Sequence, residues 1–119
     1  MQDFRKLKVW EKSHQLSIDL YHATGSFPKE EMFGLTSQMR RAAVSIPSNI
    51  AEGCGRDGDA ELARFLNIAM GSASELECQL QMARDMEMLP VTQYDPLNTK
   101  LLEPKRQLNT FLQRLKANR

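Results

Sequence analysis

The feature of this sequence that most constrains its fold is the spacing of its apolar residues. Leu35, Met39, Ala42, Ile46 and Ile50 follow one another at intervals of four, three, four and four residues. Intervals of this kind place side chains on one face of an α-helix. The same pattern continues in the next segment, over Leu62, Phe65, Ala69, Ala73, Leu76, Leu80 and Ala83. No stretch alternates apolar and polar residues for long enough to indicate a strand.

Four helices are predicted, at about residues 7–24, 35–53, 59–88 and 92–116. Gly25 and Gly53 follow the first two apolar patterns and are typical of helix ends. Acidic residues on either side of Gly58 predict an N-cap for the third helix. Asp95 followed by a proline predicts the start of the fourth, although an earlier start at Thr92 also fits the pattern.

Two prolines fall inside the predicted helices. Pro47 lies in the second helix, where it removes one backbone donor and crowds the preceding turn, so we expect a kink there. Pro104 lies in the fourth helix and predicts a bend or a division of that helix.

Short connections make neighbouring helices antiparallel, so the predicted fold is all-α, an antiparallel up-down-up-down four-helix bundle. The 119 residues suit a single domain over residues 1–119.

No apolar run approaches the ~18 residues that a membrane span needs, and the first residues are charged where a signal peptide would be apolar. We therefore expect a cytoplasmic protein with no membrane association, in which Cys54 and Cys78 stay reduced.

The second and third helices each carry a further, weaker apolar face. Val44, Pro47 and Ala51 form this face on the second helix. On the third helix the face is interrupted by a glutamate and contains Ile68, Gly71, Cys78, Met82 and Met86. An exposed apolar face of this kind favours a subunit interface, and hence a homo-oligomer. The alternative is a core that is wider than usual.

A polar stripe runs along one edge of the second helix, directly beside its apolar face. It consists of Gln38, Arg41, Ser45, Asn49, Glu52 and Arg56, at intervals of three or four residues. Glu75 and Glu77 on the third helix are expected to pair with Arg40, Arg41 or Arg56. Half-buried polar groups need partners, so one interpretation is a hydrogen-bonded network that sets helix register. The other is a groove for a ligand or partner. If the stripe is a structural hydrogen-bonded network, Glu52 and Arg56 form a buried pair.

Motifs for catalysis, cofactors and metals fail on their context. The run Gly53-Cys-Gly-Arg-Asp-Gly58 matches the dinucleotide fingerprint, but it follows a helix and not a strand, so we interpret it as a turn between helices. His14 and His22 are eight residues apart, without a carboxylate at metal-binding spacing. The polar stripe contains no histidine or lysine that would activate a serine. We expect no enzyme activity, no cofactor and no metal.

Charge is unevenly distributed although the net charge is only +1. Residues 57–94 carry two basic and seven acidic groups, whereas residues 95–119 carry six basic and two acidic groups. Adjacent helices of opposite charge are one interpretation, and a basic surface for nucleic acid is the other. Few aromatic residues interleave with the basic ones, so we expect electrostatic contact without base stacking or sequence specificity. The candidate contacts are Arg5, Lys6, Lys8, Lys100, Lys105, Arg106, Arg114, Lys116 and Arg119.

Two long runs resemble a known family. They extend from Phe33 to Gly53 (FGLTSQMRRAAVSIPSNIAEG) and from Arg64 to Leu80 (RFLNIAMGSASELECQL). Together with Leu7 to Trp10 (LKVW), Tyr21, Phe27 and Pro28, they closely resemble the bacterial 23S rRNA-intervening sequence proteins. The resemblance covers nearly the whole chain and weakens after about Leu89.

The resemblance implies an antiparallel four-helix bundle that assembles as a pentameric ring. It implies no catalytic residues, since none is known for the family. A related branch comprises the accessory variability proteins of diversity-generating retroelements, pentamers that bind a reverse transcriptase and nucleic acid through basic surfaces. We therefore expect a non-enzymatic oligomeric binding or scaffold protein, with RNA, DNA or a nucleic-acid-handling protein as partner. The alternative is a purely protein-binding scaffold with no role in nucleic-acid binding.

Overall fold

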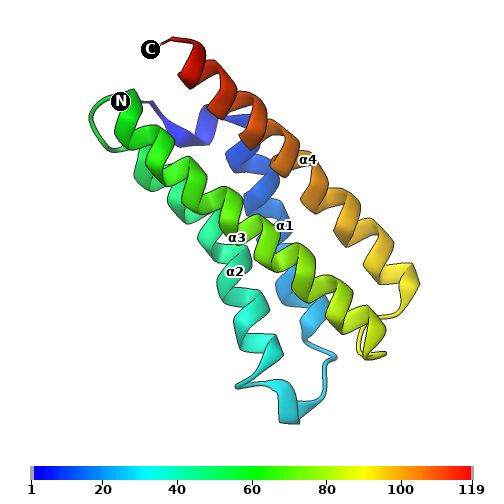
Figure 1. The fold of residues 1–119 in the computed structure, drawn as a ribbon. Coiled ribbons are helices and arrows are strands. Elements are labelled where there is room, and N and C mark those ends of the chain that lie inside the picture. The colour runs from blue at the N-terminus through cyan, green and yellow to red at the C-terminus, as the bar shows by residue number, and fades with distance from the viewer. Residues whose placement is uncertain (1, 119) are drawn as a thin grey trace.

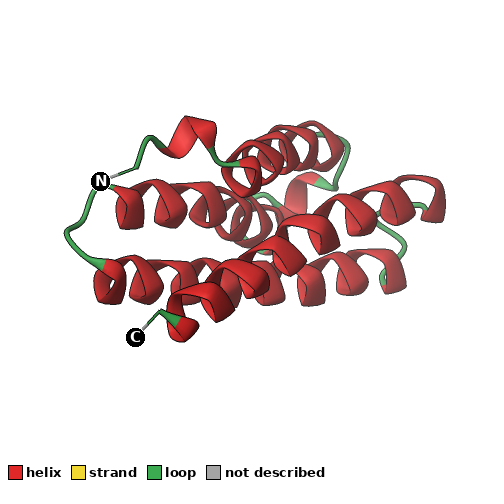
Figure 2. Ribbon diagram, turned by 90° about the horizontal axis from the view of Figure 1, so that it is seen from above, coloured by secondary structure: helices red, strands yellow, loops and turns green. Residues whose placement is uncertain are grey.

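The computed structural model describes residues 2–118, which form four long helices lying side by side (Figure 1). Within these residues there is no strand, and every long element is a helix (Figure 2). Short 3₁₀ turns, η1 and η2, precede α1 and α2. In chain order the elements are η1 (Phe4–Lys6), α1 (Lys8–Thr24), η2 (Lys29–Glu31), α2 (Leu35–Cys54), α3 (Asp59–Asp85) and α4 (Val91–Ala117). The predicted all-α four-helix bundle is confirmed.

The bundle closes as a square in which each helix packs against two neighbours. α1 contacts α2 and α4, and α3 contacts the same two helices from the opposite corner. The chain measures 46 × 23 × 20 Å along its principal axes. Both chain ends and the α2–α3 connection lie at one end of the bundle, and the α1–α2 connection lies at the other (Figure 1).

The predicted apolar stripes form the core. Met39, Ile46 and Ile50 of α2 have no exposed surface, and Leu35 at the start of the stripe is half-buried. Every predicted stripe residue of α3 is buried, from Leu62 to Ala83. The helical spacing therefore identified the inward-facing side of both helices correctly.

The connection between α2 and α3 is the glycine-rich run that matches the dinucleotide fingerprint. It joins two helices, as predicted, and contains no strand. Gly53 is buried where the helices approach most closely, because a Cβ there would lie 3.0 Å from Cβ of Phe65 and 3.1 Å from Cδ1 of Leu62. Gly58 has a φ of 85°, a backbone conformation that favours glycine. These glycines thus serve packing and chain reversal.

α3 starts at Asp59, as predicted, but its predicted N-cap and its predicted end are both corrected. Gly58 is the N-cap and no side chain caps the helix, so the neighbouring aspartates do not play the predicted capping role. The helix ends at Asp85 and not at residue 88. Glu87 adopts a left-handed φ of 61°, and the Leu89 N–H turns back to donate to the Ala83 carbonyl at 3.2 Å. Burial of the Leu89 side chain accompanies this early turn.

The start of α4 agrees within one residue with the predicted start at residue 92, whereas the alternative start at Asp95 and the division at Pro104 are not observed. The helix begins at Val91, directly after Pro90, so Asp95 and Pro96 lie inside its early turns instead of capping it. The Tyr94 N–H donates to the Pro90 carbonyl at 2.8 Å, and the Tyr94 side chain is buried. Pro104 does not divide the helix. Its side chain is buried between the core positions Leu101 and Leu108, so packing holds the helix together across the missing backbone donor.

Candidate functional site

The polar stripe of α2 joins α2 to α3 through a small hydrogen-bonded network. Ser45 Oγ lies 2.8 Å from Ser72 Oγ, and Asn49 Nδ2 donates to both the carbonyl and the hydroxyl oxygen of Ser45, at 2.7 and 2.9 Å. All three side chains are half-buried. A helix–helix hydroxyl pair in this position supports the structural interpretation for the middle of the stripe.

Arg40 points away from this network and binds α1. Its Nε donates to Thr24 Oγ1 at 2.8 Å, and one terminal nitrogen donates to the Tyr21 carbonyl at 3.3 Å. The guanidinium carbon also lies 4.1 Å from the centre of the Tyr21 ring. Arg40 therefore fastens the end of α1 to α2 and is not part of a groove along α3.

A polar groove of about 360 Å³ lies next to the serine pair. Arg41 and Glu75 stand on its two sides, and neither makes an ion pair within residues 2–118. Glu75 accepts only a long hydrogen bond from Gln79 Nε2, at 3.4 Å. The groove is lined by Gln38, Arg41, Ala42, Ser45, Ser72 and Glu75. The stripe is thus a structural network in its middle and an open groove beside it.

The expected partners of Glu75 and Glu77 are wrong. Neither pairs with Arg40, Arg41 or Arg56. Glu77 instead accepts from Lys105 Nζ at 2.6 Å, across the α3–α4 contact. The prediction failed because it considered only the α2 side of α3, whereas the rotation of α3 turns Glu77 toward α4.

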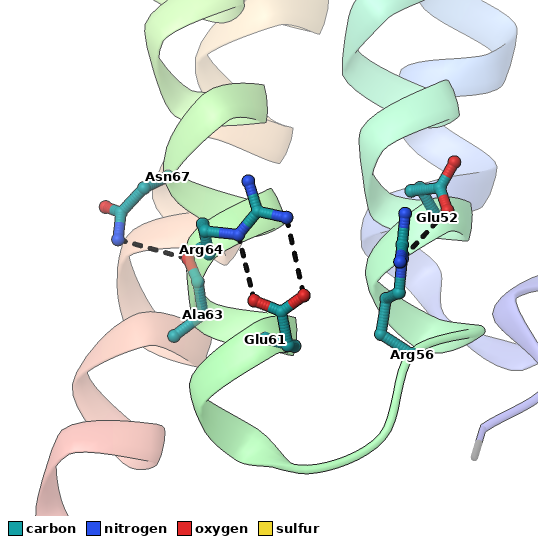
Figure 3. A network of polar contacts seen from close by, with 6 residues as sticks. All are labelled: Glu52, Arg56, Glu61, Ala63, Arg64 and Asn67. Atoms are coloured by element: carbon teal, nitrogen blue, oxygen red, sulfur yellow. Dashed lines mark hydrogen bonds and ion pairs between the residues drawn. The ribbon is translucent and has the colours of Figure 1, made fainter.

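The Glu52–Arg56 pair forms as predicted, but on the surface. Arg56 Nε donates to Glu52 Oε2 at 3.1 Å, and the two side chains are 47% and 51% exposed. Across the α2–α3 turn, Arg64 makes a similar exposed pair with Glu61 at 2.9 Å, and this hydrogen bond lowers the pKa of the Glu61 carboxyl (Figure 3). In the single chain this pair is therefore exposed, and the structural interpretation does not extend to this end of the stripe.

Because this pair is exposed, we predict that Glu52→Ala lowers the free energy of unfolding by under ~1 kcal/mol. A buried pair would cost about 3–5 kcal/mol. Denaturant unfolding of the parent and the variant at equal protein concentration measures the difference. A loss above about 3 kcal/mol would mean that Glu52 is buried in the assembled protein.

The candidate nucleic-acid contacts divide into paired and unpaired cations. Arg5 pairs with Asp3 at 3.1 Å, Lys100 with Asp19 at 2.8 Å, and Lys105 with Glu77. The Lys100 hydrogen bond lowers the pKa of Asp19, so its stabilisation is present at neutral pH and is lost as the pH falls through that lowered pKa. Ion pairs between neighbouring helices thus account for part of the uneven charge.

The remaining candidate cations make no ion pair within residues 2–118, and all of them are exposed: Lys6, Lys8, Arg106, Arg114 and Lys116. Arg119 lies outside the described residues. Lys8, in the first turn of α1, and Arg114, near the end of α4, line one pocket. Basic residues from the two ends of the chain thus share one surface at this pair.

An apolar groove of about 490 Å³ lies between α1 and α2. Val44, Pro47 and Ala51, the predicted second face of α2, all line it, and Val44 is 54% exposed. The α1 side of the groove was missed by the sequence analysis. It contains Trp10, His14, Ser17, Ile18 and Tyr21. The intervals of four, four and three residues from Trp10 through His14 and Ile18 to Tyr21 are the signal for a second face on this helix as well.

The second face of α3 is exposed too. Ile68, Met82 and Met86 are 42%, 46% and 53% exposed. Because α1 and α3 occupy opposite corners of the bundle, this face is separate from the α1–α2 groove. The chain thus presents two distinct apolar surfaces.

Within residues 2–118, no group of three or more histidine, cysteine, aspartate or glutamate side chains is arranged to hold a metal ion. None of the helices there combines the length and the apolar character needed to cross a membrane. Cys54 and Cys78 are both free thiols, and burial is the main cause that raises the pKa of the Cys54 thiol.

Comparison with known proteins identifies the family. Residues 5–110 match the 23S rRNA-intervening sequence proteins. This chain belongs to that family. Among solved structures, this 23S rRNA-intervening sequence protein is similar to a protein of unknown function from the S23 ribosomal protein family of Bacteroides thetaiotaomicron. The two share 25% sequence identity with a TM-score of 0.79, over 87% of this chain and 97% of the other. Comparison with curated proteins gives no match.

Proposed function

We propose that this 23S rRNA-intervening sequence protein is a non-enzymatic binding module of the cytoplasm, which assembles with copies of itself and presents a basic end to nucleic acid. The observation that carries the nucleic-acid role is the position of four cations that make no ion pair within residues 2–118. Lys6 ends η1, Lys8 begins α1, and Arg114 and Lys116 lie in the last turns of α4. These segments meet at one end of the bundle (Figure 1). Clustered cations without ion-pair partners are the footprint of phosphate binding.

Self-assembly is supported by the two apolar surfaces. The α1–α2 groove and the exposed face of α3 lie on different sides of one chain, which suits head-to-tail contact between copies and closure into a ring. The number five comes from the family resemblance. In a ring, the basic end of each chain is repeated, so one strand of nucleic acid can engage several chains at once.

The non-enzymatic character is supported by the composition of the polar groove. Its two serines hydrogen-bond to one another, and no histidine or lysine lines it to activate either hydroxyl.

A purely protein-binding scaffold is the second candidate. The connection between α1 and α2 favours it, because Phe33 is 97% exposed and Met32 is 45% exposed. An aromatic side chain so fully in water is a typical anchor for a protein partner.

Electrostatic binding predicts a steep dependence on salt. Four phosphate contacts per chain give a loss of duplex affinity of roughly 100-fold between ~50 and ~200 mM salt. The measurement is a titration of labelled RNA and duplex DNA at both salt concentrations. Lys116→Glu is expected to weaken binding, whereas Lys29→Glu, the same charge change in η2 at the far end of the bundle, is expected to leave it unchanged.

Lys105 is not a suitable residue for that test, because reversing its charge would break the ion pair with Glu77 and disturb the α3–α4 contact. The nucleic-acid role would be contradicted if the protein did not bind at the lower salt concentration. It would also be contradicted if the affinity changed neither with salt concentration nor with Lys116→Glu. The protein-binding scaffold would then be the better account.

A further inference from the structure

A pocket of about 390 Å³ lies where the start of α1 meets the last turns of α4. Its lining combines apolar side chains with polar and charged ones, the usual composition of a site for a small organic group. The lining residues are Gln2, Leu7, Lys8, Val9, Gln107, Phe111 and Arg114.

The rim of the pocket is positively charged. Lys8 and Arg114 both line it and make no ion pair in the part of the chain that the structure describes, and no carboxylate is among the lining residues. Leu7, Lys8 and Val9 form the beginning of α1, where the helix dipole adds to the attraction for an anion. The pocket therefore favours a negatively charged group at its mouth.

The interior suits a planar, partly apolar group. Phe111 is half-buried, packs against the core and lines the pocket, with the Arg114 guanidinium carbon 5.8 Å from its ring centre. Two amide side chains, Gln2 and Gln107, stand beside it. The Gln107 Oε1 atom is buried without a hydrogen-bond partner among residues 2–118. A buried amide oxygen without a partner means that the surroundings of Gln107 within the described residues do not satisfy its hydrogen-bonding capacity.

We propose that this pocket binds one nucleotide unit of a single-stranded nucleic acid, RNA or DNA. Lys8 and Arg114 contact the phosphate, the base lies against Phe111, and the glutamine amides meet the edge of the base. A duplex keeps its bases stacked and paired, so it offers only phosphates to the same residues. This inference rests on the proposed nucleic-acid role and adds to it a preference for single strands.

This pocket departs from the expectation of nucleic-acid binding without base stacking. In the sequence, Phe111 lies far from Lys8. It joins Lys8 only because α4 returns alongside α1.

The test compares affinities for oligo(U), oligo(dT) and a blunt duplex of the same length. Phe111→Leu is expected to weaken binding of both single strands by about 5- to 100-fold and to leave duplex binding unchanged. Phe111→Tyr, which keeps the ring, is expected to retain binding. Lys8→Ala with Arg114→Ala is expected to reduce the salt slope for single strands by about 1.4. The matched control is Arg106→Ala, an exposed unpaired cation that does not line the pocket.

The outcomes separate this inference from the proposed function. If the parent binds nucleic acid but Phe111→Leu has the same single-strand affinity, the pocket assignment is overturned and the basic end remains the binding surface. If Lys8→Ala with Arg114→Ala keeps the parent's salt slope, neither residue contacts phosphate, which contradicts both the pocket assignment and this half of the basic end. If the parent binds no nucleic acid at ~50 mM salt, the proposed nucleic-acid role fails first. Circular dichroism melting of each variant excludes loss of folding as the cause of a negative result.

Discussion

Ile18→Glu together with Val44→Glu is expected to convert the assembled protein into single chains of 13.6 kDa. The two side chains line the α1–α2 groove from opposite sides and are 38% and 54% exposed in the single chain. Because each already faces water, the substitutions should change the stability of one chain by only about 0.5 kcal/mol each. At an interface with another copy they would bury two carboxylates without partners, which is strongly unfavourable.

Met82→Glu provides the reciprocal test on α3, since a head-to-tail contact needs both surfaces. Asn109→Glu on the exposed side of α4 is the control, because it adds the same charge outside both apolar surfaces. Size exclusion coupled to light scattering gives the mass of each variant. Assembly that survives Ile18→Glu with Val44→Glu would mean that the groove is not the subunit contact.

Leu66→Ala is expected to lower the free energy of unfolding by about 3–5 kcal/mol. Leu66 has no exposed surface and lies in the core cluster between α3 and its neighbours. Removing its side chain loses apolar burial and leaves a cavity that the surrounding helices fill only in part.

Leu112→Ala is the matched control for this change. The residue type is the same, but Leu112 is half-buried at the edge of the core, so the loss should be smaller, about 1–2 kcal/mol. Denaturant unfolding must be carried out at one protein concentration, because assembly adds to the apparent stability. Equal losses for the two variants would mean that Leu66 is no more deeply buried than Leu112.

The helices and the core could be predicted because both depend on local periodicity. Leu35 to Ile50 repeat at helical intervals, and nothing elsewhere in the chain overrides that pattern. Helix ends were less predictable, since they depend on contacts distant in sequence. Asp95 and Pro96 have the local chemistry of a helix start, yet the burial of Tyr94 extends the helix back to Val91. In the same way, α3 ends early where Leu89 turns into the core.

The side-chain partners of the candidate site were the least predictable part. Glu52 and Arg56 were paired correctly because they are four residues apart on one helix. The partner of Glu77 is Lys105 on another helix, and finding it requires the rotation of α3 about its axis. The pocket of Lys8, Phe111 and Arg114 was hidden for the same reason, since its residues come from both ends of the chain.

Self-assembly is the central claim of this account, and the mass of the unmodified protein in solution tests it most directly. Size exclusion coupled to light scattering, at micromolar concentrations and moderate salt, should give about five times 13.6 kDa, with no change on dilution across that range. A single species at 13.6 kDa throughout the range would contradict the assembly and leave the apolar surfaces of α1, α2 and α3 to a different protein partner.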